Sequence, residues 1–175
     1  MSRFLYPTEY YTSTYSIDFG QYYRMGYRGI LFDIDNTLVP HNAMSDERSR
    51  TLLEELRRAG FSVCFVSNNK EPRVADFVSE LHVDGLPDVI YVFKAGKPGK
   101  QGYCDAMRRL GTTPGNTLFV GDQLFTDIWG ANRAGIHSIL VKPIDKKEEI
   151  QIVLKRILER PILKLYRRKH PLQGE

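Results

Sequence analysis

Two aspartates that stand two positions apart follow the first apolar run of the sequence. Asp33 and Asp35 come directly after residues 29–32 (GILF), and side chains two apart on an extended strand project toward the same side. In such a pair one carboxylate can attack phosphorus as a nucleophile while the other donates a proton to the leaving oxygen. The pair is therefore a candidate centre for phosphoryl transfer.

Further polar side chains follow three later apolar runs. They are Ser67 and Asn68 after 62–66, Lys97 in the loop after 89–93, and Asp122 and Asp127 at and beyond the end of 117–120. Gathered carboxylates repel one another unless a cation is bound, and oxygen ligands near a phosphate favour Mg²⁺ over zinc or copper. A metal ion, a lysine and a hydroxyl group around the phosphoryl oxygens would supply the charge neutralisation that phosphoryl transfer needs.

The elements that must position these side chains alternate along the chain. Short apolar runs, β-branched or aromatic and apolar on both faces, are typical of buried parallel strands, and amphipathic stretches between them indicate helices. The expected strands are 29–32, 62–66, 89–93, 117–120 and 138–141, and the expected helices are 46–59, about 71–81, 99–110 and 124–134.

This alternation predicts an α/β fold, Rossmann-like, with a parallel sheet of about five strands flanked by helices and joined by right-handed crossovers. Ligands of such sheets collect beyond the carboxyl ends of the strands. The predicted fold would therefore bring the polar residues of the four strand ends into one site.

Taken in this order, the four segments resemble the four motifs of the haloacid dehalogenase superfamily. More narrowly, the sequence resembles the bacterial YqeG family of subfamily IIIA phosphatases, and the likeness covers nearly the whole chain. The segments are 33–39 (DIDNTLV), 67–69 (SNN), 97–98 (KP) and 121–127 (GDQLFTD).

The resemblance implies a magnesium-dependent phosphatase with a defined role for each motif residue. Asp33 would form an aspartyl-phosphate intermediate, and Asp35 would act as general acid and then as base toward water. Thr37 would order the loop after the nucleophile. The remaining implied roles are phosphoryl binding by Ser67 and Lys97, substrate contact by Asn68, and Mg²⁺ binding by Asp33, the backbone carbonyl of Asp35, Asp122 and, in support, Asp127.

The domain organisation follows from what precedes and follows the regular pattern. Residues 1–28 form an aromatic-rich arm, which either covers the body of the domain or contributes to the substrate mouth or an interfacial surface. Residues 29–145 form the phosphatase core, and 146–175 a basic amphipathic helix and tail. We expect the helix at 146–159 to be interrupted near Pro161, because proline removes a helical hydrogen bond.

The composition is typical of a globular protein and limits the kinds of protein that the sequence can encode. A chain of 175 residues with 42% hydrophobic and 26% charged residues fits one globular domain. No apolar run is long enough to cross a bilayer, and the N-terminus lacks the apolar core of a signal peptide. We therefore expect a cytoplasmic protein, and we expect no disulfide between Cys64 and Cys104.

The motifs do not identify the substrate, so the rest of the chain must indicate its class. The gaps between the motifs have no room for a cap domain, so the mouth should be open and suit a phosphate displayed on a surface. Residues 155–169 carry seven basic side chains and one acid, Glu159, a balance that favours anionic partners.

YqeG-like proteins are similar to the mitochondrial and plastid phosphatidylglycerophosphatases. The resemblance therefore favours phosphatidylglycerophosphate as substrate, with an anionic phospholipid as partner and peripheral contact at the inner membrane face through 155–169. Nucleic acid is not expected as a partner. Two alternatives stay open: a soluble phosphatase for a nucleotide, sugar phosphate or phosphoprotein, and a binding module associated with the ribosome or RNA.

Overall fold

A single parallel sheet organises the chain. The computed structural model describes residues 4–81, 87–145 and 150–174, and its six strands lie in the order β1-β6-β5-β2-β3-β4. Their bounds are β1 Glu9–Tyr11, β2 Gly29–Phe32, β3 Ser62–Val66, β4 Ile90–Val92, β5 Thr117–Gly121 and β6 His137–Val141. The predicted α/β fold is confirmed, with one strand more than expected.

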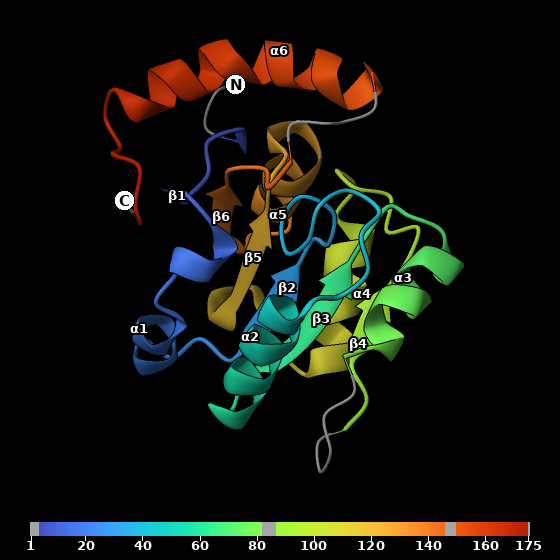
Figure 1. Ribbon diagram of the computed structural model, residues 1–175. Helices are drawn as coiled ribbons and strands as arrows, with labels where there is room; N and C mark the ends of the chain where they lie inside the picture. The colour runs from blue at the N-terminus through green and yellow to red at the C-terminus, as the bar shows by residue number, and fades with distance from the viewer. Residues whose placement is uncertain (1–3, 82–86, 146–149, 175) are drawn as a thin grey trace.

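Helices cover both faces of this sheet (Figure 1). Successive residues of a strand point to opposite faces of the sheet. Ile30 and Phe32 pack with α1, α2 and α3 on one face, whereas Leu31 packs with α4 and α5 on the other. The helices are α1 Phe19–Arg24, α2 Glu47–Arg58, α3 Glu71–Ser79, α4 Gln101–Leu110, α5 Trp129–Arg133 and α6 Ile150–Arg167.

The sixth strand, β1, comes from the aromatic arm. It pairs in parallel with β6, with Glu9 opposite Ile139, and buries the rings of Tyr10 and Tyr11. Three residues are too few to show a strand period in the sequence. This strand can therefore be recognised only from its pairing with β6 in the structure. The end of the chain returns to the same edge, because the N–H of Gln173 donates to the carbonyl of Tyr10 at 2.9 Å.

The C-terminal helix α6 runs without a break through Pro161, so the interruption expected there is wrong. Proline leaves the carbonyl of Ile157 without its helical donor, but Ile157 is 51% exposed and its carbonyl can bond to water instead. Buried side chains on either side of the proline, Glu159 and Tyr166, anchor the helix to the body. The part of the expected helix at 146–149 lies outside the described residues.

The expected helix at 124–134 is divided. Its first part, η4 (Leu124–Ile128), is a π-helical turn, and α5 follows it directly. Within the turn the N–H groups of Asp127 and Ile128 both bond to the carbonyl of Gln123. The wide turn lets the Asp127 carboxylate fold back and accept the N–H of Gln123 at 3.0 Å. Such turns are frequent at functional sites.

The sheet changes direction at β2. From β2 the chain moves outward through β3 to β4, then crosses to β5 and continues outward the other way to β6. The crevice beyond the carboxyl ends of β2 and β5 is the topological switch point, where ligands bind in open α/β sheets. Helix α6 lies across this same end of the sheet (Figure 1).

Candidate active site

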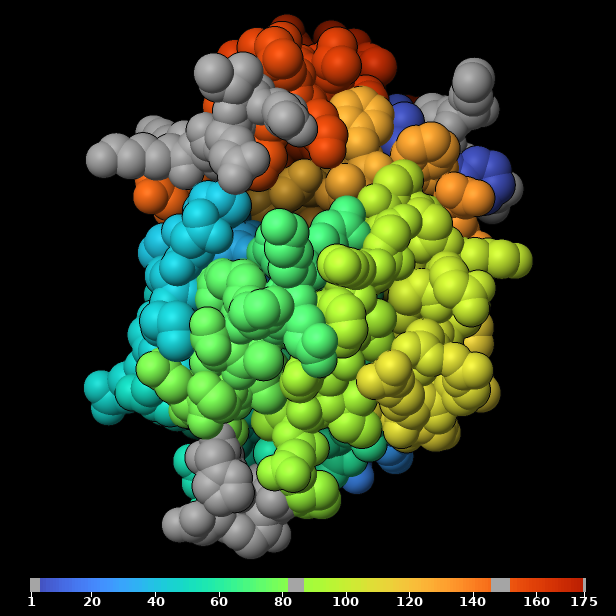
Figure 2. Space-filling view, turned by 90° about the vertical axis from the view of Figure 1, so that its right-hand side faces the viewer, coloured from blue at the N-terminus to red at the C-terminus, as the bar shows by residue number. Residues whose placement is uncertain are grey.

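A pocket of about 180 Å³ opens at the switch point. The loops after β2, β3 and β4 supply most of its polar lining, and α6 closes one side with Ile152 and Lys155. In the space-filling view the C-terminal segment forms a ridge along this end of the molecule (Figure 2). The pocket is therefore less open than the sequence predicts, because the C-terminal helix forms one of its walls.

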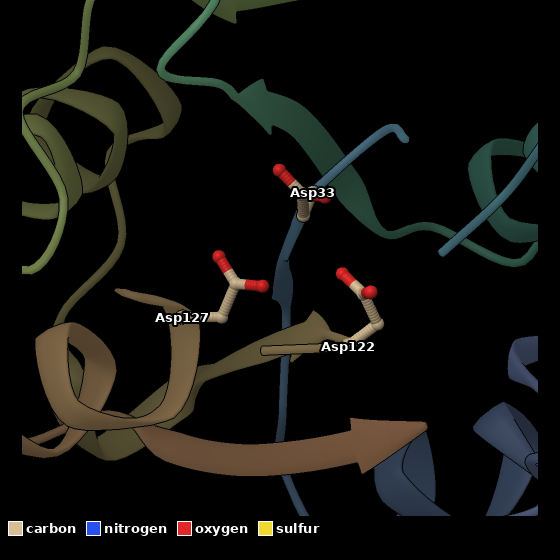
Figure 3. Close-up of side chains that lie close together, drawn as sticks. All are labelled: Asp33, Asp122 and Asp127. Atoms are coloured by element: carbon tan, nitrogen blue, oxygen red, sulfur yellow. The ribbon is translucent and has the colours of Figure 1, made fainter. Parts of the chain in front are cut away.

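Three aspartates meet beside the pocket (Figure 3). Asp33, Asp122 and Asp127 are buried, and one carboxylate oxygen from each lies within 4.8 Å of the others. Buried carboxylates this close repel one another unless cations lie among them. An all-oxygen donor set of this kind fits a hard divalent cation, so these three residues suit the Mg²⁺ ion that the motifs predict.

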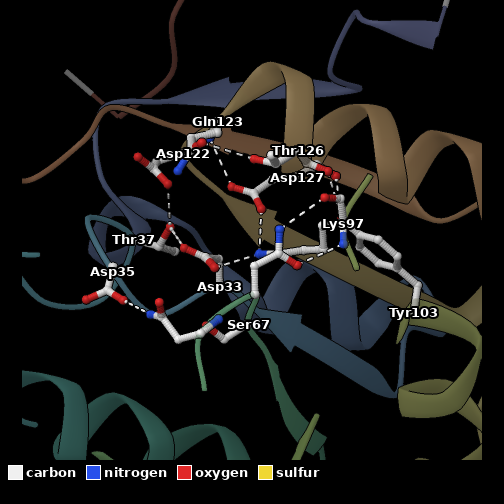
Figure 4. Close-up of polar contacts among 12 residues, drawn as sticks. Asp33, Asp35, Thr37, Ser67, Lys97, Tyr103, Asp122, Gln123, Thr126 and Asp127 are labelled. Atoms are coloured by element: carbon white, nitrogen blue, oxygen red, sulfur yellow. Dashed lines mark hydrogen bonds and ion pairs between the residues drawn. The ribbon is translucent and has the colours of Figure 1, made fainter. Parts of the chain in front are cut away.

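Lys97 connects two of the three carboxylates (Figure 4). Its ammonium group lies 2.6 Å from Asp33 Oδ1 and 2.7 Å from Asp127 Oδ1, and its side chain is 2% exposed. Burial raises the pKa of Asp33 to about 7, although the charge of Lys97 opposes the shift. Burial also lowers the pKa of Lys97, but the carboxylates of Asp127 and Asp33 outweigh it, and the net shift is upward.

Gly121 allows this cluster to form. A Cβ at Gly121 would lie 2.7 Å from the side-chain atoms of Asp127, closer than van der Waals contact allows. The absence of a side chain at the end of β5 thus lets the π-helical turn bring its carboxylate against the strand.

The remaining motif residues hold the surrounding loops. The Asn68 amide accepts the N–H of Lys97 at 2.8 Å and donates to its carbonyl at 3.0 Å, which ties the loop after β3 to the loop that carries the lysine. Ser67 is buried and lines the pocket. Thr37 Oγ1 lies 3.5 Å from Asp33 Oδ2 and 3.4 Å from Asp122 Oδ1.

The aromatic arm supports the loop after β2. Thr14 donates to the carbonyl of Thr37 and Tyr15 donates to the carbonyl of Leu38, each at 2.7 Å. Part of the arm therefore holds the backbone that follows the candidate nucleophile.

The Asp35 side chain lies apart from the three clustered carboxylates. It accepts hydrogen bonds from Asn69 Nδ2 at 2.6 Å, from the N–H of Asn42 at 2.7 Å and from Arg73 at 3.0 Å. It still lines the pocket. Three donors thus orient the Asp35 side chain at the edge of the pocket.

Several residues that contact the site were not found from the sequence. Tyr103 donates to the carbonyls of Thr126 and Asp127, and Arg156 and Glu159 reach the loop after β5 from α6. Arg156 and Glu159 both lie in the basic segment 155–169, but that segment predicted contact with anionic partners and not with the site. Asn69 belongs to the SNN segment at 67–69, but no pattern pointed to its contact with Asp35, and Arg73 gave no signal.

The raised pKa of Asp33 predicts how the metal-free protein responds to pH. Between pH about 4 and 7 the folded chain keeps a proton on Asp33 that the unfolded chain has lost, so stability falls as pH rises through this range. Without metal, we expect Asp33→Asn to stabilise the protein relative to the native chain by about 2–3 kcal/mol at pH 8, and much less at pH 5. Urea unfolding in a chelator measures this difference. An equal effect of the substitution at both pH values would contradict it.

A parallel α/β sheet with carboxylates, a lysine and a serine at four strand ends defines a hydrolase of the haloacid dehalogenase type. Residues 41–141 match the family model described as haloacid dehalogenase-like hydrolase. The whole chain is 33% identical to the probable phosphatase YqeG of Bacillus subtilis (strain 168) and covers 99% of it. The chain belongs to the haloacid dehalogenase-like hydrolase family and is a phosphatase of that type, as the motifs predict.

More distant similarities extend this comparison. The chain is 29% identical, over 87% of its length, to the chloroplastic/mitochondrial phosphatidylglycerophosphate phosphatase 1 of Arabidopsis thaliana, of which it covers 45%. NagD from E. coli K-12 superposes with a TM-score of 0.57 at 14% identity, over 74% of this chain and 92% of NagD. An uncharacterized Listeria monocytogenes protein gives 0.53 at 18% identity, over 78% and 99%. These two structures show the shared fold.

Proposed function

We propose that the chain is a Mg²⁺-dependent phosphomonoester hydrolase that acts on phosphatidylglycerophosphate through an aspartyl-phosphate on Asp33. The observation that carries the choice of a lipid substrate is the position of α6. This helix lines the catalytic pocket with Ile152 and Lys155 and exposes an apolar stripe on its outer side. The similarity to a plant phosphatidylglycerophosphate phosphatase supports the same substrate class.

The chemistry needs two proton transfers and one covalent intermediate. A carboxylate oxygen of Asp33 attacks phosphorus, the bond from phosphorus to the leaving oxygen breaks, and Asp35 gives that oxygen a proton. Asp35 then takes a proton from the water that attacks the aspartyl-phosphate. The bond between phosphorus and the Asp33 oxygen breaks, which releases phosphate and restores the carboxylate.

Other motif residues bind and orient. Ser67 and Lys97 hold the phosphoryl oxygens, and Asn68 contacts the substrate. Mg²⁺ would be held by Asp33, the Asp35 carbonyl and Asp122, with Asp127 in support, and when bound it neutralises charge on the phosphoryl group.

The outer side of α6 has the character of a membrane-surface helix. Leu154 and Leu158 are 58% and 63% exposed, and an exposed basic row runs beside them at a spacing of four residues. The stripe consists of Leu154, Ile157, Leu158, Pro161 and Leu165, and the row of Arg160, Lys164 and Arg168. An apolar stripe flanked by cations binds the interface of anionic lipid. No described helix is long and apolar enough to span the bilayer.

A vesicle experiment tests this surface. The double substitution Leu154→Asn and Leu158→Asn should weaken co-sedimentation with phosphatidylglycerol vesicles by at least about tenfold, because two exposed leucines lose their burial in lipid. Met25→Asn, at an exposed methionine after α1, is the matched control and should bind like the native chain. Equal binding by all three proteins, or equal binding to neutral phosphatidylcholine vesicles, would contradict membrane docking through α6.

A phosphate-release assay tests the substrate. With Mg²⁺ present, phosphatidylglycerophosphate in vesicles should be hydrolysed with a higher kcat/KM than glycerol 3-phosphate, a nucleotide or a phosphopeptide. A higher kcat/KM for a soluble ester would show that the substrate is not the lipid, but it would leave the proposed phosphatase mechanism unchanged. Failure to hydrolyse any of them would contradict the proposed activity and favour the ribosome- or RNA-binding module.

A further inference from the structure

The inner side of α6 carries a buried acid that the proposed chemistry does not use. Glu159 is 2% exposed, and its Oε1 accepts the N–H of Leu124 at 2.8 Å and that of Phe125 at 3.4 Å. These are the first N–H groups of η4, which would otherwise lack acceptors at the start of a helical turn. Glu159 therefore fixes the start of the turn that carries Asp127.

One turn earlier on the same side of α6, Arg156 contacts the neighbouring metal-ligand candidate. Its guanidinium donates to the backbone carbonyl and to the Oδ2 atom of Asp122, and it also lies 3.2 Å from Glu159 Oε2. The Asp122 side chain is fully buried. Arg156 and Glu159 together contact the backbone at 122, 124 and 125, so α6 holds one continuous segment of the site.

The two oxygens of Asp122 have different surroundings. Oδ2 accepts from Arg156, whereas Oδ1 lies 3.4 Å from Thr37 Oγ1, which is itself 3.5 Å from Asp33 Oδ2. The guanidinium thus occupies Oδ2, while Oδ1 faces Thr37, which lies between the two aspartates. A planar donor that bonds both the carbonyl and the carboxylate also fixes the rotation of the side chain.

We propose that Arg156 and Glu159 are positioning residues, through which the C-terminal helix holds Asp122 with Oδ1 presented to the metal ion. The inference rests on the proposed function, because it takes Asp122 as a metal ligand. It adds that the catalytic unit does not end at β6: the site is complete only with α6 in place. Groups that orient a metal ligand without touching the metal commonly change metal affinity by about 10–100-fold when they are removed.

Calorimetric titration of the metal-free protein with Mg²⁺ alone tests this role without turnover. We expect Arg156→Gln to raise the dissociation constant for Mg²⁺ by about 10–100-fold. Arg156→Lys should recover only part of the affinity, because an ammonium group cannot hold the carbonyl and the carboxylate in one plane. Arg24→Gln, which removes an exposed arginine paired with Asp18 on α1, is the matched control and should bind Mg²⁺ like the native chain.

A second variant keeps the test decisive if Arg156→Gln does not fold. Glu159→Gln retains an oxygen acceptor for the N–H groups but loses the charge that faces Arg156, and we expect a smaller loss of Mg²⁺ affinity, of about threefold to tenfold. Native or tighter Mg²⁺ binding by the folded variants would overturn the inference, since tighter binding would mean that the guanidinium competes with the metal. Absence of Mg²⁺ binding by the native chain would instead overturn the proposed metal chemistry.

Discussion

Asp33→Asn is expected to reduce phosphate release by about 10⁴-fold or more, because an amide cannot replace the attacking carboxylate. The variant should fold well. Among the described residues, Lys97 and Arg156 are the cations that pair with the three clustered carboxylates, and the substitution removes one of the three negative charges. Loss of turnover together with unchanged or higher stability distinguishes a nucleophile from a structural aspartate.

The measurement is single-turnover phosphate release with native and variant protein at equal concentration. Asp88→Asn is the matched control, because Asp88 is exposed in the loop before β4 and lies outside the pocket. It should keep native turnover. Substantial phosphate release by Asp33→Asn, above about one hundredth of the native rate, would contradict nucleophilic catalysis at this position.

Lys97→Met is expected to damage both stability and turnover. The ammonium group is the partner of two buried carboxylates, and removing one member of a buried ion pair costs about 3–5 kcal/mol, since the other member is left uncompensated. In metal-free protein the loss should be larger at pH 8 than at pH 5, where Asp33 can take up a proton. Turnover should fall by about 10³-fold, because the proposed role of Lys97 is also to hold the phosphoryl oxygens.

Urea unfolding in a chelator, repeated with Mg²⁺, separates the two effects. The metal ion should restore part of the stability of Lys97→Met, since it supplies positive charge to the same carboxylates. Lys100→Met, an exposed lysine that precedes α4, controls for loss of a lysine from this region and should change neither property. If Lys97→Met is as stable as the native chain, the ion-pair cluster does not have the energetic role assigned to it.

Local patterns predicted the part of the site that depends on strand ends. Asp33, Lys97, Asp122 and Asp127 lie together because parallel strands bring their carboxyl ends to one edge. The alternation of strands and helices is enough to place these strand ends together, and the short apolar runs of the sequence predict that alternation. The grouping of the three carboxylates therefore follows from the fold.

Other features depend on contacts that no local pattern records. β1 exists because β6 offers an open edge, and α6 continues through Pro161 because both halves of the helix are anchored. Arg156 reaches Asp122 across 34 positions of sequence, so its role follows only from the place where α6 crosses the sheet.

The orientation of the Asp35 side chain could not be predicted from the local sequence either. Asp33 and Asp35 would point to the same side if both lay on a strand, but β2 ends at Phe32 and both residues lie in the loop that follows. Three donors then hold the Asp35 carboxylate away from the clustered carboxylates.

We propose that the phosphoryl group passes through Asp33. Native protein is mixed with phosphatidylglycerophosphate and Mg²⁺, quenched in acid within one turnover, and reduced with borohydride, which converts an acyl-phosphate to an alcohol that mass spectrometry can locate. We expect reduction at position 33 that depends on substrate and Mg²⁺ and is absent from Asp33→Asn. Phosphate release without this modification, or with the modification at another aspartate, would contradict an aspartyl-phosphate on Asp33.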